Sequence, residues 1–370
     1  MFARKSPSQS RPGRFIRGSD MVNLCARLLD PFVRWVLQRC ADRFPSLCRA
    51  YDGLILRHRM RRSLGYRPNL RHPQTYNEKI AWRILNDRNP LIVATTDKLA
   101  VREYVAAKVG PDVLIPIIGV YQSAADIRWA ELPNQFVLKA SHGCDMTLIV
   151  RDKDSIDPKS ALERADAWMR QNYYELSRER AYRDIPRRII VEQLLTDDEG
   201  RIPADYKILV FHGRASLIRV HTDRFDDHRV NYYDADFRPL PVAQISPSAP
   251  AFTVPIEARS LIGLAEELAG DFDYARIDLY LARGKTWFGE ITHHDGNAHV
   301  RFQPPEFDAA LGAMWHLPLE AQDKAVRERS TISAEWTPQP SCATSRRDGP
   351  HPIPTQHLLP LDTHVRPISL

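Results

Sequence analysis

From residue 71 onward, the hydrophobic positions along the chain follow two different periods. Residues 95–110 and 158–174 have helical spacing, and residues 256–270 add a third helix. The first of these helices should be capped by Thr95 or Thr96, carry Asp97 in its first turn and stop at Gly110. Short runs of β-branched and aromatic residues predict strands at 135–141, 146–150, 187–195, 205–211, 215–221, 275–281 and 285–292. Strands that follow one another closely, mixed with helices, indicate an α+β fold with antiparallel sheets.

Both ends of the chain have a different character. Residues 1–20 are rich in Arg, Ser, Gly and Pro, and residues 331–370 contain seven of the 28 prolines, so we expect a disordered basic arm and a disordered Pro-rich tail. Residues 21–64 place apolar side chains among arginines, which predicts an amphipathic helical extension. Such a helix packs on its own protein or lies on a membrane.

Composition excludes several classes of protein. With 43% apolar and 26% charged residues, the chain is not collagen, a coiled coil, a disulfide scaffold or wholly disordered. The five cysteines form no CxxC pair, and no apolar run is long enough for a transmembrane helix. The N-terminus lacks the apolar centre of a secretory signal, so we expect a cytoplasmic protein.

The net charge of +6 is distributed unevenly. Residues 1–70 hold 15 Lys or Arg against 4 Asp, a net charge of +11, which leaves −5 for the remainder. This excess is either a solvated charge run or a contact with the anionic inner face of a membrane. No nucleic-acid-binding motif accompanies it, so nucleic acid is not an expected partner.

The stretch 275–299 carries the most informative chemistry. Period-two alternation puts Arg276, Asp278 and Tyr280 on one face of a strand, and Thr286, Phe288, Glu290 and Thr292 on one face of the next. A hairpin with an odd loop at 283–285 would set Asp278 opposite Glu290, whereas an even loop would set it opposite Gly289. Two opposed carboxylates repel and suit a hard divalent cation.

Two further segments could contribute to a phosphate site. In 136–150, a strand delivers Lys139 to a short loop that contains His142 and Gly143, where backbone amides could approach phosphate oxygens. The segment fits neither the P-loop nor the Rossmann pattern. In 187–211, a strand runs into Glu192, with Leu194 and Leu195 beyond it, which could form apolar walls around a base. Lys207 on the next strand could add a cation.

Eight segments, taken in order along the chain, resemble the TupA-like ATP-grasp family: NEKIAW, DKLAVREYV, FVLKASHG, IIVEQLL, DYKILVFHG, RVHTDRF, ARIDLY and FGEIT. Members of that family accompany genes for cell-surface polysaccharide and polypeptide synthesis. The resemblance covers residues 65–318, which it makes the catalytic domain. It implies an ATP-grasp architecture in which two α+β subdomains grip ATP between antiparallel sheets, and it implies ATP and Mg²⁺ as cofactors.

The resemblance also assigns roles to single residues. It implies Lys139 and Arg276 as catalytic residues on the ATP phosphates and the transferred phosphate, with Asp278, Glu290 and Thr292 as metal ligands. For ATP binding it implies Lys139, Gly143, Glu192, Leu194 and Leu195, and we add His142 and Lys207 from their places in the loop and the strand described above. Thr292 stands where many ATP-grasp enzymes have Asn, so Asn297 is an alternative ligand. The loop HHDGNAH also departs from the family's pattern, and His293, His294 and His299 could be transition-metal ligands or a polar turn. Cys144 has no evident base nearby and is expected to be structural.

These observations favour an ATP-dependent carboxylate–amine ligase that works through an acyl phosphate. Its substrates would be a carboxylate and an amine, either small molecules or groups on a cell-surface polysaccharide or polypeptide precursor. Two alternatives are a glycosyltransferase of surface-polysaccharide synthesis and a non-catalytic, membrane-associated nucleotide-binding protein.

Overall fold

The computed structural model describes residues 43–223, 227–244, 247–249 and 252–318. Every helix and strand reported below lies in one compact unit, Met1–Leu317. The predicted arm at 1–20 and tail at 331–370 lie outside the described residues, and of the predicted extension at 21–64 only residues 43–64 are described. In the described part of the chain, no helix has the length and apolar character needed to cross a membrane.

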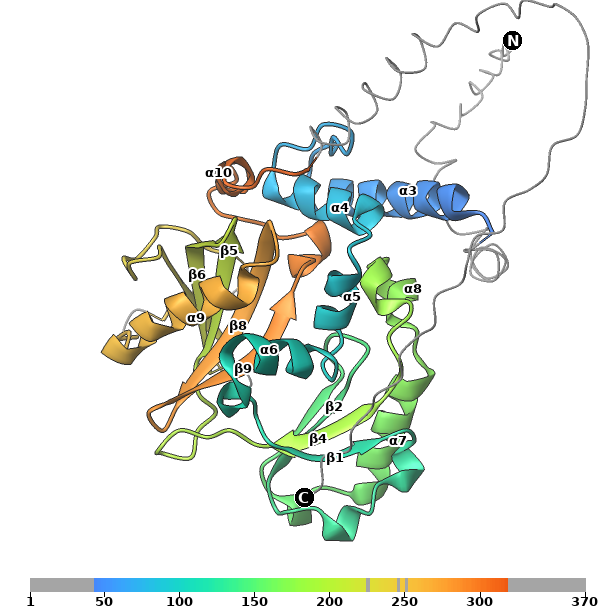
Figure 1. Cartoon of the computed structure of the whole chain (residues 1–370), viewed down its shortest axis with the longest axis vertical. Coiled ribbons are helices and arrows are strands. Elements are labelled where there is room, and N and C mark those ends of the chain that lie inside the picture. The colour runs from blue at the N-terminus through green and yellow to red at the C-terminus, as the bar shows by residue number, and fades with distance from the viewer. Residues whose placement is uncertain (1–42, 224–226, 245–246, 250–251, 319–370) are drawn as a thin grey trace, which may run out of the picture. The chain divides into compact units, whose positions relative to one another are not determined.

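Two antiparallel sheets organise the fold (Figure 1). The smaller has the strand order β1-β4-β2-β3 and the larger the order β7-β6-β5-β8-β9. The strands of the smaller sheet are β1 (Ile117–Tyr121), β2 (Phe136–Ala140), β3 (Thr147–Val150) and β4 (Ile189–Gln193). Those of the larger sheet are β5 (Asp205–Phe211), β6 (Arg214–Thr222), β7 (Arg229–Tyr233), β8 (Tyr274–Ala282) and β9 (Lys285–Thr292). All pairs between these strands are antiparallel, which confirms the predicted α+β class.

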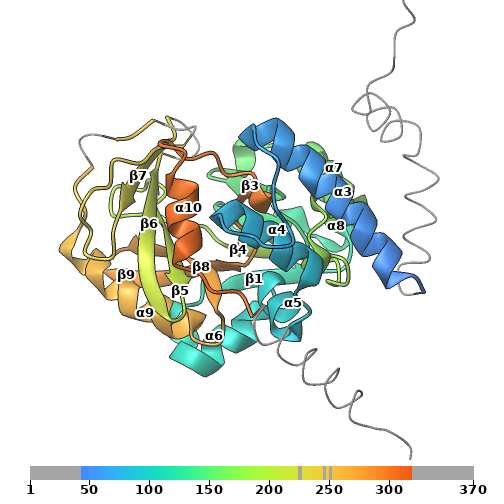
Figure 2. The same ribbon diagram turned by 90° about the horizontal axis from the view of Figure 1, so that it is seen from above.

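Helices cover the outer face of the smaller sheet and both faces of the larger one. The α-helices are α3 (Pro45–Leu64), α4 (Tyr76–Asn86), α5 (Pro90–Thr96), α6 (Val101–Val109), α7 (Pro158–Arg170), α8 (Tyr173–Ser177), α9 (Ser260–Ala269) and α10 (Phe307–Ala313). Short 3₁₀ turns are η1 (Pro111–Val113), η2 (Ala124–Asp126), η3 (Trp129–Glu131), η4 (Lys153–Ser155), η5 (Arg180–Tyr182), η6 (Ile256–Arg259) and η7 (Asp295–Ala298). In Figure 2, α4 lies between α3 and the larger sheet.

Strand alternation divides the core into three apolar clusters. On one face of the larger sheet, Ile208, Ile277 and Phe288 pack with residues of α6 and α9. The opposite face packs Leu209 and Phe211 against α3, α4 and α10. The smaller sheet buries a third cluster against α7, formed by Phe136, Leu138, Val191, Trp168 and their neighbours.

One face of the larger sheet changes character halfway along its strands. On β5, the residues Leu209 and Phe211 are covered by helices, whereas Asp205 and Lys207, on the same face, continue it with charges. Neighbouring strands extend the charged half, because Lys207 pairs with Arg219 on β6 and with Asp278 on β8. The sequence therefore places ionisable side chains side by side where the helical cover ends.

The β8–β9 hairpin reaches the predicted pairing by an unexpected route. Its turn has two residues, Arg283 and Gly284, both with positive φ, as in the tight type I′ hairpin. From this even loop, Leu279 pairs with Phe288, but a β-bulge at Gly289 then shifts the register so that Asp278 faces Glu290. Of the two alternatives, the even loop is the one present, but the bulge gives it the opposed carboxylates that were expected from an odd loop.

The bulge also corrects the predicted faces of β9. Phe288 packs in the apolar cluster with Ile291, so it does not share a face with Glu290. Arg276 and Asp278 do share the face that was predicted for them.

Two helix predictions change in detail. Thr95 and Thr96 end α5 and do not cap α6, because Asp97 closes the first helix and accepts a hydrogen bond from the Leu99 amide. The predicted helix at 158–174 breaks after Arg170 and resumes as α8. Strands β1 and β7, each at the edge of its sheet, were not predicted.

Gly289 should be required for the bulge. A Cβ atom there would lie 3.0 Å from the Asp278 carbonyl oxygen, which belongs to the backbone and cannot move freely. We expect Gly289→Ala to lower the free energy of unfolding by about 1–3 kcal/mol, measured by chemical denaturation. Gly263→Ala on α9 is the control, since a Cβ there meets nothing within 4 Å. Equal stability of the two variants would contradict this account of the bulge.

Candidate functional site

A cavity of about 450 Å³ opens between the two sheets. The smaller sheet contributes Val137, Lys139, Thr147, Ile149, Glu192 and Gln193 to its lining. The larger sheet contributes Asp205, His221, Asp278, Tyr280, Gly289 and Glu290. The connection between the sheets adds Leu194, Leu195, Arg201, Ile202 and Pro203. The lining combines apolar side chains, such as Val137, Ile149 and Leu194, with many charged side chains of both signs. Such a space fits a small ligand that has both an apolar ring and charged groups.

Lys139 and Glu192 face the cavity from neighbouring strands and form an ion pair through Nζ and Oε1. Both lie on the inner face of the smaller sheet, because side chains alternate along β2 and β4 and the preceding residues, Leu138 and Val191, belong to the outer cluster. The pair keeps both charges compensated, so an anionic ligand that contacts Lys139 must compete with Glu192.

The loop between β2 and β3 is tightly packed at Gly143. A Cβ atom on Gly143 would lie 2.8 Å from the Met146 sulfur and 3.2 Å from the Tyr173 ring. Lys98 donates from Nζ to the Gly143 carbonyl oxygen at 2.5 Å and also lines the cavity. His142 is turned away, since its Nε2 lies 3.0 Å from the Trp168 carbonyl oxygen and its side chain is buried. The structure therefore does not bring His142 to the cavity.

Cys144 lines the cavity with its Sγ 3.1 Å from the Tyr182 hydroxyl. Burial raises the pKa of this thiol. A protonated thiol is a poor nucleophile, so the geometry favours the structural role expected for it.

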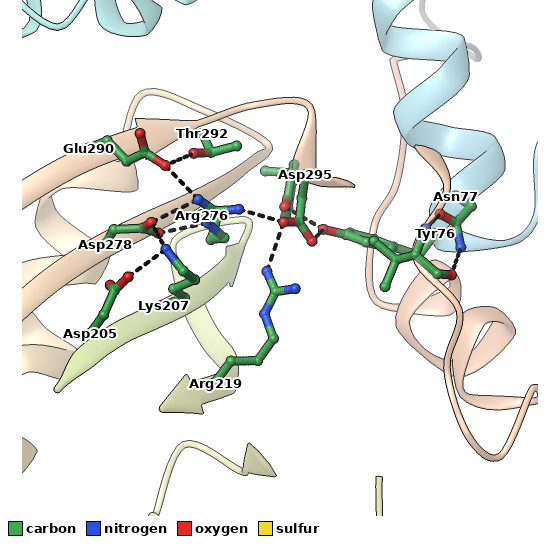
Figure 3. A network of polar contacts seen from close by, with 12 residues as sticks. Tyr76, Asn77, Asp205, Lys207, Arg219, Arg276, Asp278, Glu290, Thr292 and Asp295 are labelled. Atoms are coloured by element: carbon green, nitrogen blue, oxygen red, sulfur yellow. Dashed lines mark hydrogen bonds and ion pairs between the residues drawn. The ribbon is translucent and has the colours of Figure 1, made fainter. Parts of the chain in front are cut away.

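Arg276 is at the centre of a cluster of charged side chains, which we call the charged wall (Figure 3). Its other members are Lys207, Arg219, Asp278, Glu290 and Asp295. The Arg276 guanidinium donates from Nε and Nη2 to the two oxygens of Asp278, each at 2.7 Å. Nη2 also reaches Glu290 Oε1 at 2.7 Å, and Nη1 reaches Asp295 Oδ1 at 2.6 Å. One cation thus bridges the opposed carboxylates and ties them to the loop after β9.

Lys207 lies deeper in the same network. Its Nζ forms ion pairs with Asp205 Oδ2 at 2.9 Å and with Asp278. Lys207, which was predicted to contact phosphate, is therefore not among the side chains that line the cavity. It instead compensates the charges of Asp205 and Asp278, which do line it.

The charged wall shifts the acidity of its carboxyl groups in opposite directions. Burial alone would raise the pKa of Glu290, but Arg276, Lys207 and Lys98 outweigh it and hold this pKa well below its usual range. For Asp278, burial prevails over Arg276 and Lys207 and raises the pKa. Asp295 resembles Glu290, because Arg219 and Arg276 overcome burial and lower its pKa. Glu290 and Asp295 are therefore carboxylates at neutral pH.

The start of α4 braces this wall from the far side. The Tyr76 hydroxyl donates to Asp295 Oδ2 at 2.9 Å, and the Asn77 side chain exchanges two 2.9 Å hydrogen bonds with the backbone of Val300. Arg219 on β6 adds an ion pair to Asp295 Oδ1 at 2.9 Å. The loop between β9 and α10 is thus held from two sides. Tyr76 and Asn77 of α4 bind residues that lie 219 and 223 positions further along the chain, and Arg219 binds the loop from the larger sheet.

The other proposed ligands near this loop have different partners. Thr292 donates from its hydroxyl to Glu290 Oε1 at 3.1 Å, which keeps it beside the carboxylate pair. Asn297 donates to the Ser177 carbonyl oxygen at 2.9 Å, away from that pair. His293 contacts Thr95 at 2.8 Å and His294 lies 3.3 Å from Glu179, so the histidines do not converge.

Two cavity residues were not singled out from the sequence. Lys98 follows the buried Asp97 in the segment DKLAVREYV, which was interpreted as a helix and as part of the family resemblance, with no role for Lys98 itself. Asp205 opens β5 beside Lys207, and the alternation of that strand could have placed it on the same face. Asp295, which anchors Arg276, is hidden in an irregular loop, where no periodicity predicts which way a side chain points.

The carboxylate pair fits Mg²⁺ by the chemistry of its donors. Asp278 and Glu290 offer hard oxygen ligands from adjacent strands at the cavity wall. Across the described residues, no group of three or more His, Cys, Asp or Glu side chains is arranged to hold a metal. Mg²⁺ commonly binds to one or two carboxylates and completes its shell with phosphate oxygens and water, so two are sufficient.

Removal of the Asp295 charge should destabilise the whole wall. Asp295→Asn leaves two buried arginines with one carboxylate fewer, so we expect the free energy of unfolding at neutral pH to fall by about 3–5 kcal/mol. Because the pKa of Asp295 is lower in the folded chain, its stabilising charge acts above the unfolded pKa of about 3.9 and is lost as the pH falls through the folded value.

The two proteins should therefore converge in stability as the pH falls below about 4. Thermal unfolding across this pH range measures the difference. Asp166→Asn, which removes the partner of Arg170 from an exposed pair on α7, is the control and should change stability by less than about 1 kcal/mol. A difference for Asp295→Asn that is small at neutral pH, or constant with pH, would refute this role.

Comparison with known proteins gives three solved structures as examples of similarity. D-alanine–D-alanine ligase from Bacillus anthracis, complexed with ATP, is 14% identical with a TM-score of 0.35. That match covers 55% of this chain and 57% of the ligase chain. The D-cycloserine synthetase DcsG is 15% identical with a TM-score of 0.36, covering 60% of this chain and 71% of its own. An L-amino acid ligase from Bacillus licheniformis is 16% identical with a TM-score of 0.35, covering 59% and 46%.

No curated protein matches the chain. The assignment therefore depends on the family model described as TupA-like ATPgrasp, which matches residues 78–316 and so includes both sheets and the cavity between them. This match confirms the resemblance inferred from the ordered segments and the ATP-grasp architecture that it implied. The chain belongs to the TupA-like ATP-grasp family.

Proposed function

We propose that the chain is an ATP-dependent carboxylate–amine ligase, which binds MgATP in the cavity between its sheets and activates a carboxylate as an acyl phosphate. The observation that carries this proposal is the arrangement of the cavity. Lys139 and Glu192 lie on one wall and the opposed carboxylates Asp278 and Glu290 on the other. Membership of the ATP-grasp family supports the same ligand.

ATP would lie with its base near the connection between the sheets and its phosphates toward the charged wall. Leu194 and Leu195 follow β4 and supply apolar surface for the adenine, and Glu192 precedes them. Lys139 and Lys98 approach from the other side, where they would contact the phosphates. Gly143 allows the β2–β3 loop to pack closely at this end, so that loop would cover them.

Asp278 and Glu290, with Thr292 beside them, would hold Mg²⁺ against the phosphates. When bound, the ion neutralises charge on the phosphate oxygens and helps to orient the transferred phosphoryl group. Arg276 occupies the space between the same carboxylates, so its contacts with them must loosen. Asp295 would continue to hold Nη1 and so keep the guanidinium beside the carboxylates that face the cavity.

The chain's contribution to the reaction is electrostatic and positional. A substrate carboxylate attacks the γ-phosphorus, ADP leaves, and an acyl phosphate forms. An amine then attacks the acyl carbon and releases phosphate. Arg276 and Lys139 would stabilise charge on the transferred group in the first step, and no covalent intermediate with the chain is required.

We also propose that the acceptor or donor belongs to a precursor of a cell-surface polysaccharide or polypeptide, and that the chain works in the cytoplasm, at the inner face of the membrane. The support is the resemblance to a family found with such genes and the net charge of +11 on residues 1–70.

Titration calorimetry of the full chain with ATP, with and without Mg²⁺, tests the nucleotide site. Glu290→Gln should weaken binding about tenfold or more in Mg²⁺ and have little effect without it, because a charged oxygen ligand is lost. Lys139→Ala should weaken binding about tenfold under both conditions, since a charge-assisted contact contributes about 1.5–3 kcal/mol.

Glu163→Gln and Lys159→Ala on the exposed side of α7 are the matched controls and should bind as the unmodified chain does. Unchanged affinity in both Glu290→Gln and Lys139→Ala would refute the site. If the site holds, release of phosphate that requires both an acid and an amine identifies a ligase, whereas turnover of a nucleotide sugar without ATP cleavage would refute it.

A further inference from the structure

The outer face of α3 combines exposed leucines with exposed arginines. Leu47 and Leu54 are 57% and 63% exposed, and they lie seven residues apart, so both point to the same side of the helix. Phe44, directly before the helix, is 50% exposed. The inner face of the helix packs against the rest of the protein, and Cys48, Leu56 and Met60 on it are buried.

The charge on this surface has a single sign. Exposed arginines lie along the helix and just before it, at Arg43, Arg49, Arg57, Arg61 and Arg62. Arg301, also exposed, approaches the helix through a 3.5 Å contact between its Nη2 and the Arg62 carbonyl oxygen. The one acidic residue of α3, Asp52, is buried and accepts a 2.6 Å hydrogen bond from the Tyr174 hydroxyl. No acid therefore compensates the arginines within the exposed surface of the helix.

We propose that the outer face of α3 is a docking surface for an anionic lipid bilayer. Leu47, Leu54 and Phe44 would enter the interface between headgroups and acyl chains, and the arginines around them would contact the anionic headgroups. This proposal deepens the suggested membrane contact of residues 1–70 by assigning it to one helix face, and it does not depend on the ligase chemistry.

Charge complementarity distinguishes this occupant from the alternatives. Residues 21–42, which precede the helix, contain three arginines and two aspartates, so they have no excess of negative charge to complement the arginines of α3. A second copy would bring the same arginines against each other. An anionic bilayer complements the arginines with its headgroups and buries the leucines in its apolar region, whereas a charged polymer would leave the leucines in water.

Flotation of the full chain with vesicles tests the proposal, using phosphatidylcholine alone and phosphatidylcholine mixed with phosphatidylglycerol. The double variant L47S/L54S should bind the mixed vesicles about tenfold more weakly, because two inserted side chains are lost. The double variant R57Q/R61Q should also bind about tenfold more weakly and show a smaller loss of binding when salt is added. Neither should change affinity for MgATP.

Two control variants match these losses elsewhere on the surface. I118S/V120S removes two apolar side chains from β1 that are 40% and 42% exposed. R128Q/K159Q removes two cations whose side chains are 79% and 83% exposed. Both controls should bind vesicles as the unmodified chain does, since they lie outside α3.

Four results would overturn the proposal. One is equal vesicle binding by L47S/L54S and the unmodified chain, and another is binding that requires no anionic lipid. The third is a dimer in solution that dissociates in L47S/L54S while vesicle binding is unchanged, which would assign the surface to a second copy. The fourth is faster proteolysis of residues 21–42 in L47S/L54S with unchanged vesicle binding, which would assign it to the chain's own segment. Because MgATP affinity is measured on the same proteins, failure of this proposal is separate from failure of the nucleotide site.

Discussion

The bridging of three carboxylates by one guanidinium is the constraint on which the larger sheet depends. Asp278, Glu290 and Asp295 come from two strands and a loop, and all three meet Arg276. Like charges on adjacent strands would otherwise force the strands apart, and buried charges without partners are strongly destabilising. The wall is therefore stable without a ligand, and a ligand cation must take over contacts that already exist.

A second constraint is that the charged half and the apolar half of one sheet face belong to the same strands. Leu209 and Phe211 anchor β5 beneath the helices, which fixes where Asp205 and Lys207 lie. Tyr76 then links the helical layer directly to the charged wall through Asp295. Packing of α4 and orientation of the candidate catalytic arginine are thus parts of one structure.

Regular alternation made much of this predictable from the sequence. Strands β5 and β9 lie at their predicted positions, and the ordered segments indicated the family that the comparison confirmed. The predictions that failed concern residues whose positions depend on tertiary contacts and not on local sequence patterns. His142 turns toward Trp168 because of tertiary packing, Thr95 and Thr96 end one helix and do not begin the next, and Asp295 lies in a loop without a period. The roles of the individual site residues remain proposals.

Because of the bulge at Gly289, the number of residues in the turn does not by itself decide which residue lies opposite Asp278. A tight two-residue turn and a bulge together place Asp278 opposite Glu290, and so would a three-residue turn without a bulge. Loss of Gly289 and gain of one residue at the turn therefore compensate each other. With the spacing from Asp278 to Glu290 fixed, a turn with an even number of residues therefore needs a bulge of one residue to oppose the two carboxylates, and a turn with an odd number needs none.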